Sequence, residues 1–299
     1  MEGEEQPGQG QDDTASGEES QVNASRLDLH ARRGLVTGAG SGIGRAITLE
    51  LADRTCSLVL VGRRAGPLEE VADLVREQGG RAWVVTADLT SEGEPERAVA
   101  ESVQALAGLD LLVNNAGNVR AGALDEDIDV PDIYAMVRLN LLAPILATRA
   151  ALPHLREAGT AHGQAAVLGI ASGAALVGVP YYSVYAATKA GLARFDEALR
   201  RELTGTGIHV ATSYPGATET HMMVSSQAGA DLGFERRPVD EVASEIVAAL
   251  EAREADINTQ RPERRELQEL NITDPPAVDA RLAPTLGALR EAVRNHRSI

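Results

Sequence analysis

Residues 34–44 read GLVTGAGSGIG, a short apolar run followed by a turn that contains four glycines. Apolar residues then recur with helical spacing as far as Asp53, and residues 57–61 form a second apolar run. The pattern predicts a strand, a glycine-rich turn, a helix and a second strand. Glycines at such a turn let the backbone approach a phosphate, towards which the helix N-terminus directs free N–H groups. Although glycines also make ordinary turns, this context favours dinucleotide binding.

The same alternation of strands and helices continues to about residue 258. Further strands are predicted at 81–86, 110–113, 165–170 and 208–213 and near Ile257, and further helices at 67–78, 94–107, 131–157, 183–203 and 238–253. The strands are nearly continuous apolar runs, as expected for a parallel sheet that is buried on both faces. The chain therefore reads as a single α/β domain: a doubly wound, mostly parallel sheet with helices on both faces.

Three segments of different composition divide the chain. Residues 1–29 carry eight acidic residues and one arginine, with few apolar residues between them. Such a segment cannot bury enough apolar surface to fold, so we expect an acidic disordered tail. Residues 30–258 form the predicted α/β domain. Residues 259–299 are a C-terminal extension in which 261–278 show no clear pattern and 279–295 are predicted to be helical.

Composition narrows the classes of partner. The net charge of −16 disfavours nucleic acid and anionic membranes as partners. The opening MEGEEQPGQG does not resemble a signal peptide, and no uninterrupted apolar run reaches the length of a bilayer span, so a cytoplasmic location is predicted. The single cysteine, Cys56, is expected to be a small core residue. The six histidines lack ligand spacing, which predicts no metal site; we expect surface or loop positions for them, with His221 nearest the predicted site.

Polar residues follow several of the predicted strands. Arg63, Asp88, the NNAG stretch at 114–117 and Ser172 all come where a strand ends. Ligands of doubly wound sheets bind at the carboxyl ends of the strands. We therefore expect these residues to share one site with the glycine turn.

The end of the second strand bears on the choice of cofactor. An acidic residue there would hold the ribose 2′-hydroxyl of NAD, but the chain has Gly62 followed by Arg63 and Arg64. A guanidinium attracts a 2′-phosphate. The pattern favours NADP(H), with NAD(H) as the alternative and two solvated arginines as the purely structural interpretation.

Tyr185 and Lys189 are a candidate catalytic pair. Lys189 is the only lysine of the chain, and it follows Tyr185 at a spacing that places both side chains on one face of a helix. Burial raises the pKa of a phenol, because it disfavours the phenolate. A positive charge about 4 Å away stabilises the phenolate by roughly 4 kcal/mol and so lowers the pKa. The lysine can therefore lower the pKa of the tyrosine into a working range. By itself such a pair also fits a surface helix.

Taken together, these motifs resemble the short-chain dehydrogenase/reductase family over roughly residues 33–255. The residues that carry the resemblance are TGAGSGIG at 37–44, Asp88, NNAG at 114–117, Asn140, Ser172, Tyr185 with Lys189, and Pro215-Gly216 followed by Thr220. Their order and spacing are specific, although each alone is not. The resemblance implies a single-domain Rossmann fold with a seven-stranded sheet.

The resemblance also implies roles for individual residues. The implied catalytic residues are Asn140, Ser172, Tyr185 and Lys189. Tyr185 would be the acid in carbonyl reduction and the base in alcohol oxidation, Ser172 would hold the substrate oxygen, and Asn140 would hold a water that links Lys189 to solvent. Without the resemblance, Asn140 would read as a hydrogen-bonded core residue. The implied cofactor-binding residues are Thr37, Gly38, Ser41, Gly42, Ile43, Gly44, Arg63, Asp88, Leu89, Asn114, Ala116, Gly117, Tyr185, Lys189, Pro215, Gly216, Thr218 and Thr220.

Within those residues, Gly38, Gly42 and Gly44 would line the pyrophosphate turn. Asp88 would bind the adenine, Asn114 the adenosine-ribose region, Thr220 the carboxamide and Arg63 the 2′-phosphate. One departure concerns Ser41, where many NADP-preferring members carry a basic residue. Of the two basic residues that usually mark NADP preference, the chain therefore has the one at Arg63 and lacks the one at position 41.

These residues predict an NADP(H)-dependent oxidoreductase that acts on an apolar carbonyl compound or secondary alcohol. An NAD-dependent alcohol dehydrogenase of the same family and a non-catalytic NADP(H)-binding regulator are the alternatives. Residues 221–237 are predicted to form a lid or a plain surface loop, and the pocket candidates are Asn118, Ala174, Tyr181, Tyr182, Met222 and Met223. A homodimer or homotetramer through helices 131–157 and 183–203 is implied by the resemblance.

Overall fold

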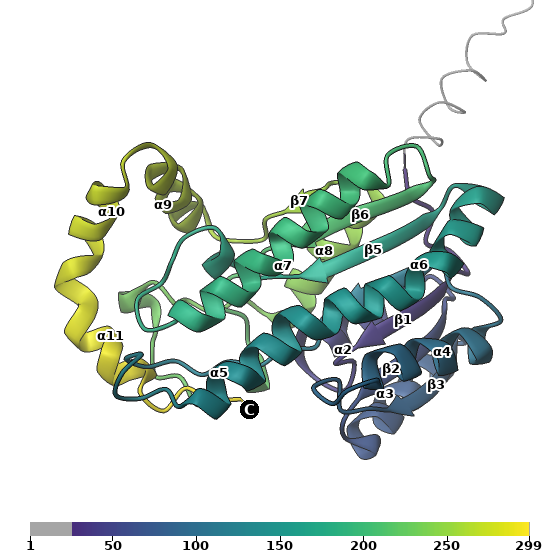
Figure 1. Ribbon diagram of the computed structural model, residues 1–299, viewed down its shortest axis with the longest axis horizontal. Helices are drawn as coiled ribbons and strands as arrows, with labels where there is room; N and C mark the ends of the chain where they lie inside the picture. The colour runs from purple at the N-terminus through teal and green to yellow at the C-terminus, as the bar shows by residue number, and fades with distance from the viewer. Residues whose placement is uncertain (1–25, 299) are drawn as a thin grey trace, which may run out of the picture.

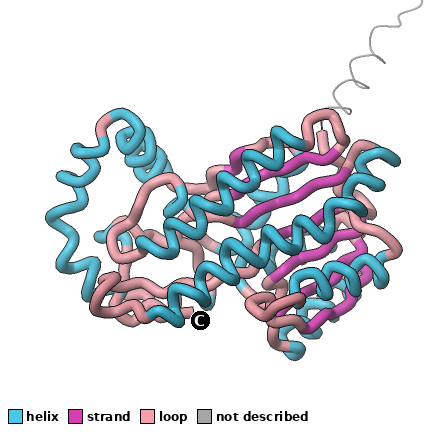
Figure 2. The backbone as a smooth tube through the Cα atoms, in the orientation of Figure 1, coloured by secondary structure: helices cyan, strands magenta, loops and turns pink. Residues whose placement is uncertain are grey.

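The computed structural model describes residues 26–298, and its centre is a sheet of seven parallel strands (Figures 1 and 2). The strands, in the spatial order β3-β2-β1-β4-β5-β6-β7, are β1 (Arg33–Thr37), β2 (Ser57–Gly62), β3 (Arg81–Thr86), β4 (Leu111–Asn114), β5 (Ala165–Ile170), β6 (Ile208–Ser213) and β7 (Asp256–Ile257). The order reverses between β1 and β4, which is where doubly wound sheets bind ligands. The predicted fold class is confirmed, and every strand pair is parallel.

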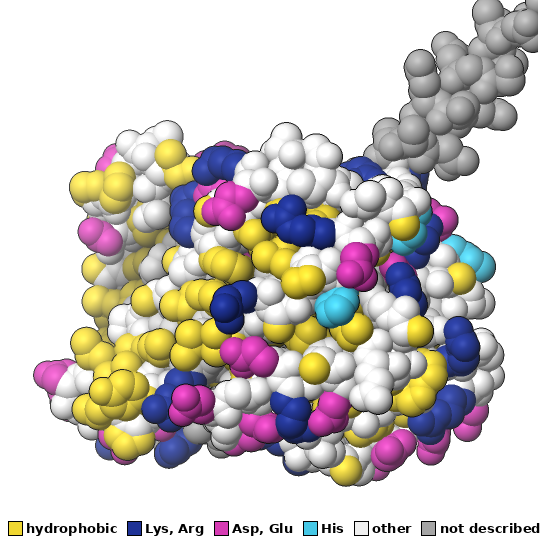
Figure 3. All heavy atoms as spheres, turned by 45° about the vertical axis from the view of Figure 1, so that its right-hand side comes forward, with side chains coloured by type: hydrophobic (Ala, Val, Ile, Leu, Met, Phe, Trp, Pro, Cys, Tyr) yellow, Lys and Arg dark blue, Asp and Glu magenta, His cyan; other side chains and the backbone are white. Residues whose placement is uncertain are grey.

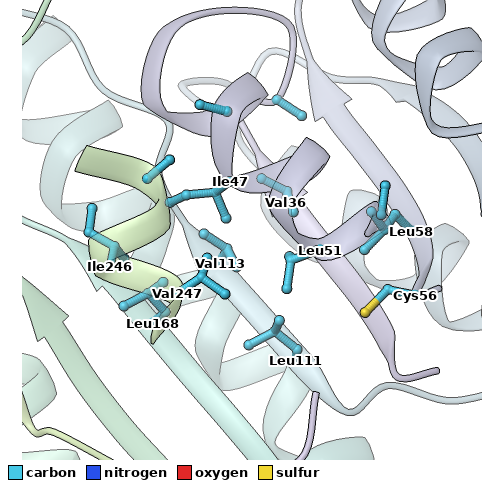
Figure 4. Packing of buried hydrophobic residues seen from close by; sticks show 14 of the residues in the cluster. Val36, Ile47, Leu51, Cys56, Leu58, Leu111, Val113, Leu168, Ile246 and Val247 are labelled. Atoms are coloured by element: carbon cyan, nitrogen blue, oxygen red, sulfur yellow. The ribbon is translucent and has the colours of Figure 1, made fainter. Parts of the chain in front are cut away.

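Helices cover both faces of the sheet. One face carries α2 (Gly42–Ala52), α3 (Ala65–Glu77) and α8 (Val239–Glu251); the other carries α4 (Glu94–Leu106), α6 (Ala143–His162) and α7 (Ser183–Glu202). The short helix α5 (Val130–Val137) precedes α6 and packs against α7. The buried side chains form two large apolar clusters, one on each face. Figure 4 shows the first, where Ile47 of α2 and Ile246 of α8 pack over Val36 and Val113 of the central strands.

Cys56 lies in this first cluster, as predicted. Its thiol is buried, with Sγ 3.1 Å from the carbonyl oxygen of Leu29. Burial raises the pKa of the thiol to about 11, so Cys56 is a protonated core residue at neutral pH.

The N-terminal boundary of the folded part differs from the prediction. Leu27 and Leu29, assigned to the disordered tail, are buried in the first cluster, and the Leu27 N–H donates to the carbonyl oxygen of Glu251. The ordered chain thus begins before residue 30 because these two leucines cover the ends of α2 and α8. Residues 1–25, the rest of the predicted tail, lie outside the described residues.

The predicted helix 131–157 is one continuous helical segment, Val130–His162, made of α5, a π-helical turn (Arg138–Leu142) and α6. Its length, and the mean hydropathy of 1.3 of one 18-residue window within it, are enough for a membrane span, although a core helix of a globular domain meets the same criteria. Here α6 packs against β4, β5 and α4 through buried residues that include Ala147, Ala151 and Leu155. We therefore treat the segment as a sheet-covering helix.

The C-terminal extension is more helical than predicted. Residues 261–278, which show no sequence pattern, contain α9 (Pro262–Thr273), and the predicted helix 279–295 is split into α10 (Pro275–Leu282) and α11 (Leu286–Val293) by a 3-10 turn (Ala283–Thr285). Pro284 sits in that turn and lacks the N–H that a continuous helix needs. The three helices form an arch beyond the carboxyl ends of the strands (Figure 1). Leu267 and Val278 anchor it on Val177, in the segment after β5.

Candidate active site

A cavity of about 1050 Å³ opens at the carboxyl ends of the strands. It runs from the turn between β1 and α2, past the N-terminal part of α7, to the helices α9 and α10 of the extension. Such a position and size suit a dinucleotide together with a small substrate.

Tyr185, Lys189 and Ser172 all line this cavity. Tyr185 and Lys189 project from α7, whose helical spacing puts them one turn apart, and Ser172 follows β5. Lys189 is 4% exposed; its ammonium donates to the carbonyl oxygen of Ile170 at 2.8 Å and lies 6.0 Å from the centre of the Tyr185 ring. The Ser172 hydroxyl accepts from the Ala174 N–H at 3.2 Å, which fixes the turn that presents it.

The pKa of Tyr185 differs from the sequence-based expectation. Burial raises the pKa of the phenol, and the neighbouring Ser172 hydroxyl lowers it only in part. Burial also lowers the pKa of Lys189 to about 8, so the lysine is a weaker source of positive charge than a solvated one. The predicted lowering by Lys189 is therefore wrong for this arrangement: its Nζ is committed to the Ile170 carbonyl, and the phenol stays protonated at neutral pH.

Asn140 lies in the π-helical turn between α5 and α6 and is fully buried. Its Oδ1 accepts from the Asn118 N–H at 2.8 Å, and its Nδ2 donates to the Asn118 carbonyl oxygen at 2.9 Å and to the Thr188 hydroxyl at 3.2 Å. A Cβ on Gly117 would stand 3.2 Å from Asn140 Oδ1 and 3.3 Å from Lys189 Nζ. The asparagine and the lysine thus converge on Gly117, and the π-turn is what rotates Asn140 towards them.

Most of the predicted cofactor-binding residues line the cavity. They are Gly38, Ser41, Gly42, Ile43, Arg63, Leu89, Ala116, Gly117, Tyr185, Lys189, Pro215, Gly216, Thr218 and Thr220. Gly38 and Gly42 have φ values of +66° and +53°, which favour glycine. Ser41 precedes α2 without a side-chain cap, so the N–H groups of the first turn are available to a phosphate. These residues fit a nicotinamide dinucleotide, and Arg63 and Arg64 line the same cavity.

Four of the predicted cofactor-binding residues do not line the cavity. Thr37 and Gly44 brace the turn: the Thr37 hydroxyl donates to the Val113 carbonyl oxygen and accepts from the N–H groups of Asn115 and Ala116. The Asn114 side chain points away from the cavity and donates to the Thr148 hydroxyl of α6 at 2.9 Å. Asp88 is exposed and accepts from the N–H and hydroxyl of Thr90. Their direct contact with a cofactor remains a prediction.

Gly44 offers a test of the turn. A Cβ at Gly44 would overlap the Gly38 carbonyl oxygen and the Asn115 side-chain amide, which itself donates to the carbonyl oxygens of Thr37 and Gly38. We expect Gly44→Ala to lower the free energy of unfolding by about 2–4 kcal/mol and to weaken dinucleotide binding, measured by denaturant titration and thermal shift. The control is Gly66→Ala in α3, where a Cβ meets nothing within 4 Å and stability should be unchanged or higher. Equal stability of the two variants would contradict this account.

Sequence reasoning missed the contribution of the extension to the cavity. Gln260 is 7% exposed, its Nε2 is buried without a hydrogen-bond partner among the described residues, and its amide lies against Gly173, next to Ser172. His296, expected at the surface or in a loop, lies in a loop but is only 2% exposed: Tyr182 donates to its Nδ1 at 2.7 Å, and its Nε2 donates to the Met222 carbonyl oxygen at 2.9 Å. No local pattern marks either residue, because each acquires its role through contacts that are distant in sequence.

Four of the six predicted substrate-pocket residues line the cavity, and two do not. Ala174, Tyr182, Met222 and Met223 line the cavity, together with His221 and Phe234. Asn118 and Tyr181 do not; the Asn118 backbone holds Asn140, and the Tyr181 carbonyl oxygen accepts from the Gly122 N–H. Residues 221–237, predicted as a lid or a plain loop, form part of the cavity wall.

Within residues 26–298, no group of three or more His, Cys, Asp and Glu side chains is placed to hold a metal ion. The site as a whole offers a protonated phenol, a hydroxyl and an ammonium beside a turn that is open to phosphate. Such an arrangement can bind a dinucleotide and deliver a proton to an oxygen atom next to its reactive end.

Comparison with known proteins places this site in a family. The family model described as short chain dehydrogenase matches residues 33–231. A short chain dehydrogenase of Pseudocercospora fijiensis is 33% identical over 195 residues, which span 65% of this chain and 62% of that protein. The 11-beta-hydroxysteroid dehydrogenase-like 4A of Arabidopsis thaliana is 34% identical over 225 residues, 75% of this chain and 71% of that protein.

A solved structure agrees with the sequence relatives. The crystal structure of a short chain dehydrogenase from Burkholderia cenocepacia, in complex with NADP, has a TM-score of 0.70 and 32% identity, and covers 77% of this chain and 96% of that one. The matched family region ends at residue 231, so α9, α10 and α11 lie beyond it. On the matched sequence and the shared fold, the chain belongs to the short chain dehydrogenase family.

Proposed function

We propose that the protein is an NADP(H)-dependent oxidoreductase that transfers hydride between the nicotinamide and a carbonyl compound or secondary alcohol, with Tyr185 as the acid or base. The observation that carries the proposal is that Ser172, Tyr185 and Lys189 face the same cavity as the open glycine turn and Arg63. The bound cofactor would supply the hydride chemistry, and the protein would supply binding, orientation and proton transfer.

In the reducing direction, the substrate oxygen would lie between the hydroxyl groups of Ser172 and Tyr185. Negative charge that grows on this oxygen would be stabilised by both hydroxyls, and Tyr185 would then donate its proton. The raised pKa of Tyr185 suits this direction, because the phenol is fully protonated at neutral pH. Lys189, with its pKa lowered to about 8, is poised to exchange a proton near neutrality, and the buried Asn140 lies beside it across Gly117.

Cofactor choice is tested by thermal shift with NADPH and NADH on the parent protein and on Arg63→Ala. A ligand at about 100 times its dissociation constant stabilises by about 2.7 kcal/mol, which is readily measured. We expect NADPH to stabilise the parent more than NADH and Arg63→Ala to remove the difference, because the guanidinium lies at the cavity wall beside Gly62.

The matched control for this test is Arg149→Ala, which removes the same charge from an exposed position on α6 outside the cavity. A larger shift with NADH in the parent would contradict the choice of NADP(H) and favour the NAD-dependent alternative. No shift with either cofactor would contradict the oxidoreductase itself.

We further propose a homo-oligomer built through the helices α5, α6 and α7. Large apolar side chains are exposed along α5 and the π-turn, namely Val130, Tyr134, Val137 and Leu142, with Leu124 before them. Figure 3 shows hydrophobic side chains gathered on this side of the molecule. The cytoplasmic location and the absence of nucleic-acid and membrane partners stay predictions from composition.

A further inference from the structure

The wall of the cavity that is farthest from the glycine turn belongs to the C-terminal extension. Leu267 and Gln268 of α9, Arg281 and Leu282 of α10 and Thr285 of the following turn all line it. The extension is fixed in place at both ends: Leu267 and Val278 pack on Val177, while His296 and Ser298 bond to the Met222 and Val119 carbonyl oxygens. This wall is therefore a built part of the cavity.

The lining of the cavity is cationic, although the protein has a net charge of −16. Seven arginines line it, against three carboxylates, Asp231, Glu235 and Glu263. Arg63 and Arg64 lie at the cofactor end. Three more arginines are neutralised by carboxylates: Arg237 pairs with Glu245 at 2.7 Å, Arg261 with Glu235 at 3.0 Å and Arg297 with Asp132 at 3.1 Å.

Arg264 and Arg281 remain, both in the extension. Neither has a carboxylate within 4.0 Å among residues 26–298. Arg264 donates through Nε and Nη2 to the Gly233 carbonyl oxygen, at 2.9 and 2.6 Å, and its guanidinium lies 5.3 Å from the Phe234 ring centre. These contacts fix the Arg264 fork at the wall but provide no negative charge. Burial and the nearby positive charge of Arg281 both lower the pKa of Arg264.

Arg281 has no such structural task. It lines the cavity from α10 and makes no side-chain hydrogen bond or ion pair with any residue between 26 and 298. Two guanidiniums that line one cavity, with no carboxylate within 4.0 Å of either, repel each other, and an anion bound by both would remove that repulsion. The contact with Gly233 accounts for the position of Arg264, whereas Arg281 is an exposed side chain in the last turn of α10 at the edge of the cavity.

Apolar side chains line the cavity both beside Tyr185 and beside the extension. Val179 and Met222 belong to the apolar cluster of Tyr185, and Val177, Leu267 and Leu282 belong to the cluster that anchors the extension. A ligand that reaches from Tyr185 to Arg281 would therefore need an apolar middle and a charged far end.

We propose that Arg281, together with Arg264, binds a carboxylate at the far end of the substrate, so that the substrate class is an oxo acid, or the corresponding hydroxy acid, with an apolar chain between its two functional groups. This inference rests on the proposed function for the position of the reacting carbonyl. It refines the expectation of a purely apolar substrate, because the extension adds a site for negative charge.

The test uses medium-chain oxo acids of increasing length and their methyl esters, with NADPH, on the parent, Arg281→Gln and Arg294→Gln. Arg294 is the matched control: it is an exposed arginine of the extension that does not line the cavity. We expect the parent to prefer the acid over its ester, and Arg281→Gln to lower kcat/KM for the acid by about 10- to 100-fold, mainly through KM, as expected for a lost charge-assisted hydrogen bond. The ester should be turned over equally by the parent and both variants.

Equal use of acid and ester by the parent, or an unchanged acid-to-ester ratio in Arg281→Gln, would overturn the inference while leaving the oxidoreductase intact. A binding experiment tests the carboxylate site separately from the proposed reaction. It measures the thermal shift with the medium-chain hydroxy acid and with its methyl ester, and it needs no turnover. A larger shift with the acid that Arg281→Gln abolishes supports the carboxylate site even if no compound is reduced, in which case only the proposed reaction fails. Equal or absent shifts with both compounds would overturn the site.

Discussion

Tyr185→Phe is expected to lower kcat by about a thousandfold while leaving NADPH affinity within a factor of two or three. Phe keeps the ring that lines the cavity and removes only the hydroxyl, which is the group that would donate the proton. A positioned general acid typically contributes about 10²- to 10⁴-fold, and this phenol would also stabilise charge on the substrate oxygen. The measurement is single-turnover reduction by NADPH of the best oxo substrate, together with a thermal-shift titration of the cofactor.

The control for this variant is Tyr134→Phe. Tyr134 lies on α5 and is 59% exposed, so the same loss of a hydroxyl outside the cavity should leave kcat unchanged. Turnover of Tyr185→Phe at close to the parent rate would refute the assignment of Tyr185 as the acid. Loss of NADPH binding in Tyr185→Phe would instead mean that the hydroxyl is needed to bind the cofactor, so that the loss of turnover would not identify it as the proton donor.

Asp196→Asn is expected to stabilise the protein at pH 8 while leaving its stability unchanged near pH 4. Asp196 is 1% exposed in α7, seven residues after Lys189; its Oδ2 accepts from the Thr212 hydroxyl at 3.1 Å, and its Oδ1 is buried without a partner in the described chain. Burial raises the pKa of this carboxyl from 3.8 to about 8, and the nearby Lys189 lowers it only in part. Asn keeps the shape and the acceptor for Thr212 but cannot ionise.

The sign of the pH effect follows from proton binding. Between about pH 4 and pH 8 the unfolded carboxyl has lost its proton while the folded one retains it, so the folded state binds more protons and its stability falls as pH rises. The parent should lose stability across this window, and Asp196→Asn should not. We expect the difference in unfolding free energy between the two proteins to reach roughly 2–5 kcal/mol at pH 8.

Urea titrations from pH 4.5 to 8.5 would measure this difference directly. Asp53→Asn is the control, because Asp53 is exposed at the end of α2 and its replacement should give a pH profile parallel to that of the parent. A constant difference between parent and Asp196→Asn across the window would show that Asp196 is ionised throughout in the folded protein, as one partner of a buried ion pair with Lys189.

Much of the site could be predicted from sequence because its residues lie at the ends of regular elements. The pattern around GLVTGAGSGIG indicated β1, α2 and β2, and the spacing of Tyr185 and Lys189 followed from one turn of α7. Once the strands are parallel, their carboxyl ends meet at one edge of the sheet, and Ser172 and Arg63 arrive there together. Local periodicity carries this information, since the helical and strand repeats are written into neighbouring residues.

Side-chain direction was harder to predict. Asn114 ends β4 as expected, yet its amide binds Thr148 of α6, and the Asn140 side chain is held by the Asn118 backbone. The pKa of Tyr185 was predicted with the wrong sign because the position of the Lys189 ammonium depends on the Ile170 carbonyl. Each of these outcomes rests on a hydrogen bond between segments that are far apart in the chain.

The sequence by itself determined the α/β fold, the glycine turn and the set of reactive side chains, since these depend on apolar periodicity and on residue type. Only the tertiary structure decided that the extension folds over the site, buries His296 and places Arg264 and Arg281 at the cavity wall. Its first helix, α9, carries few apolar residues, and the extension is held by contacts with Val177, Gly233 and Met222. Such contacts leave no periodic signal in the sequence, because their partners lie in other segments of the folded chain.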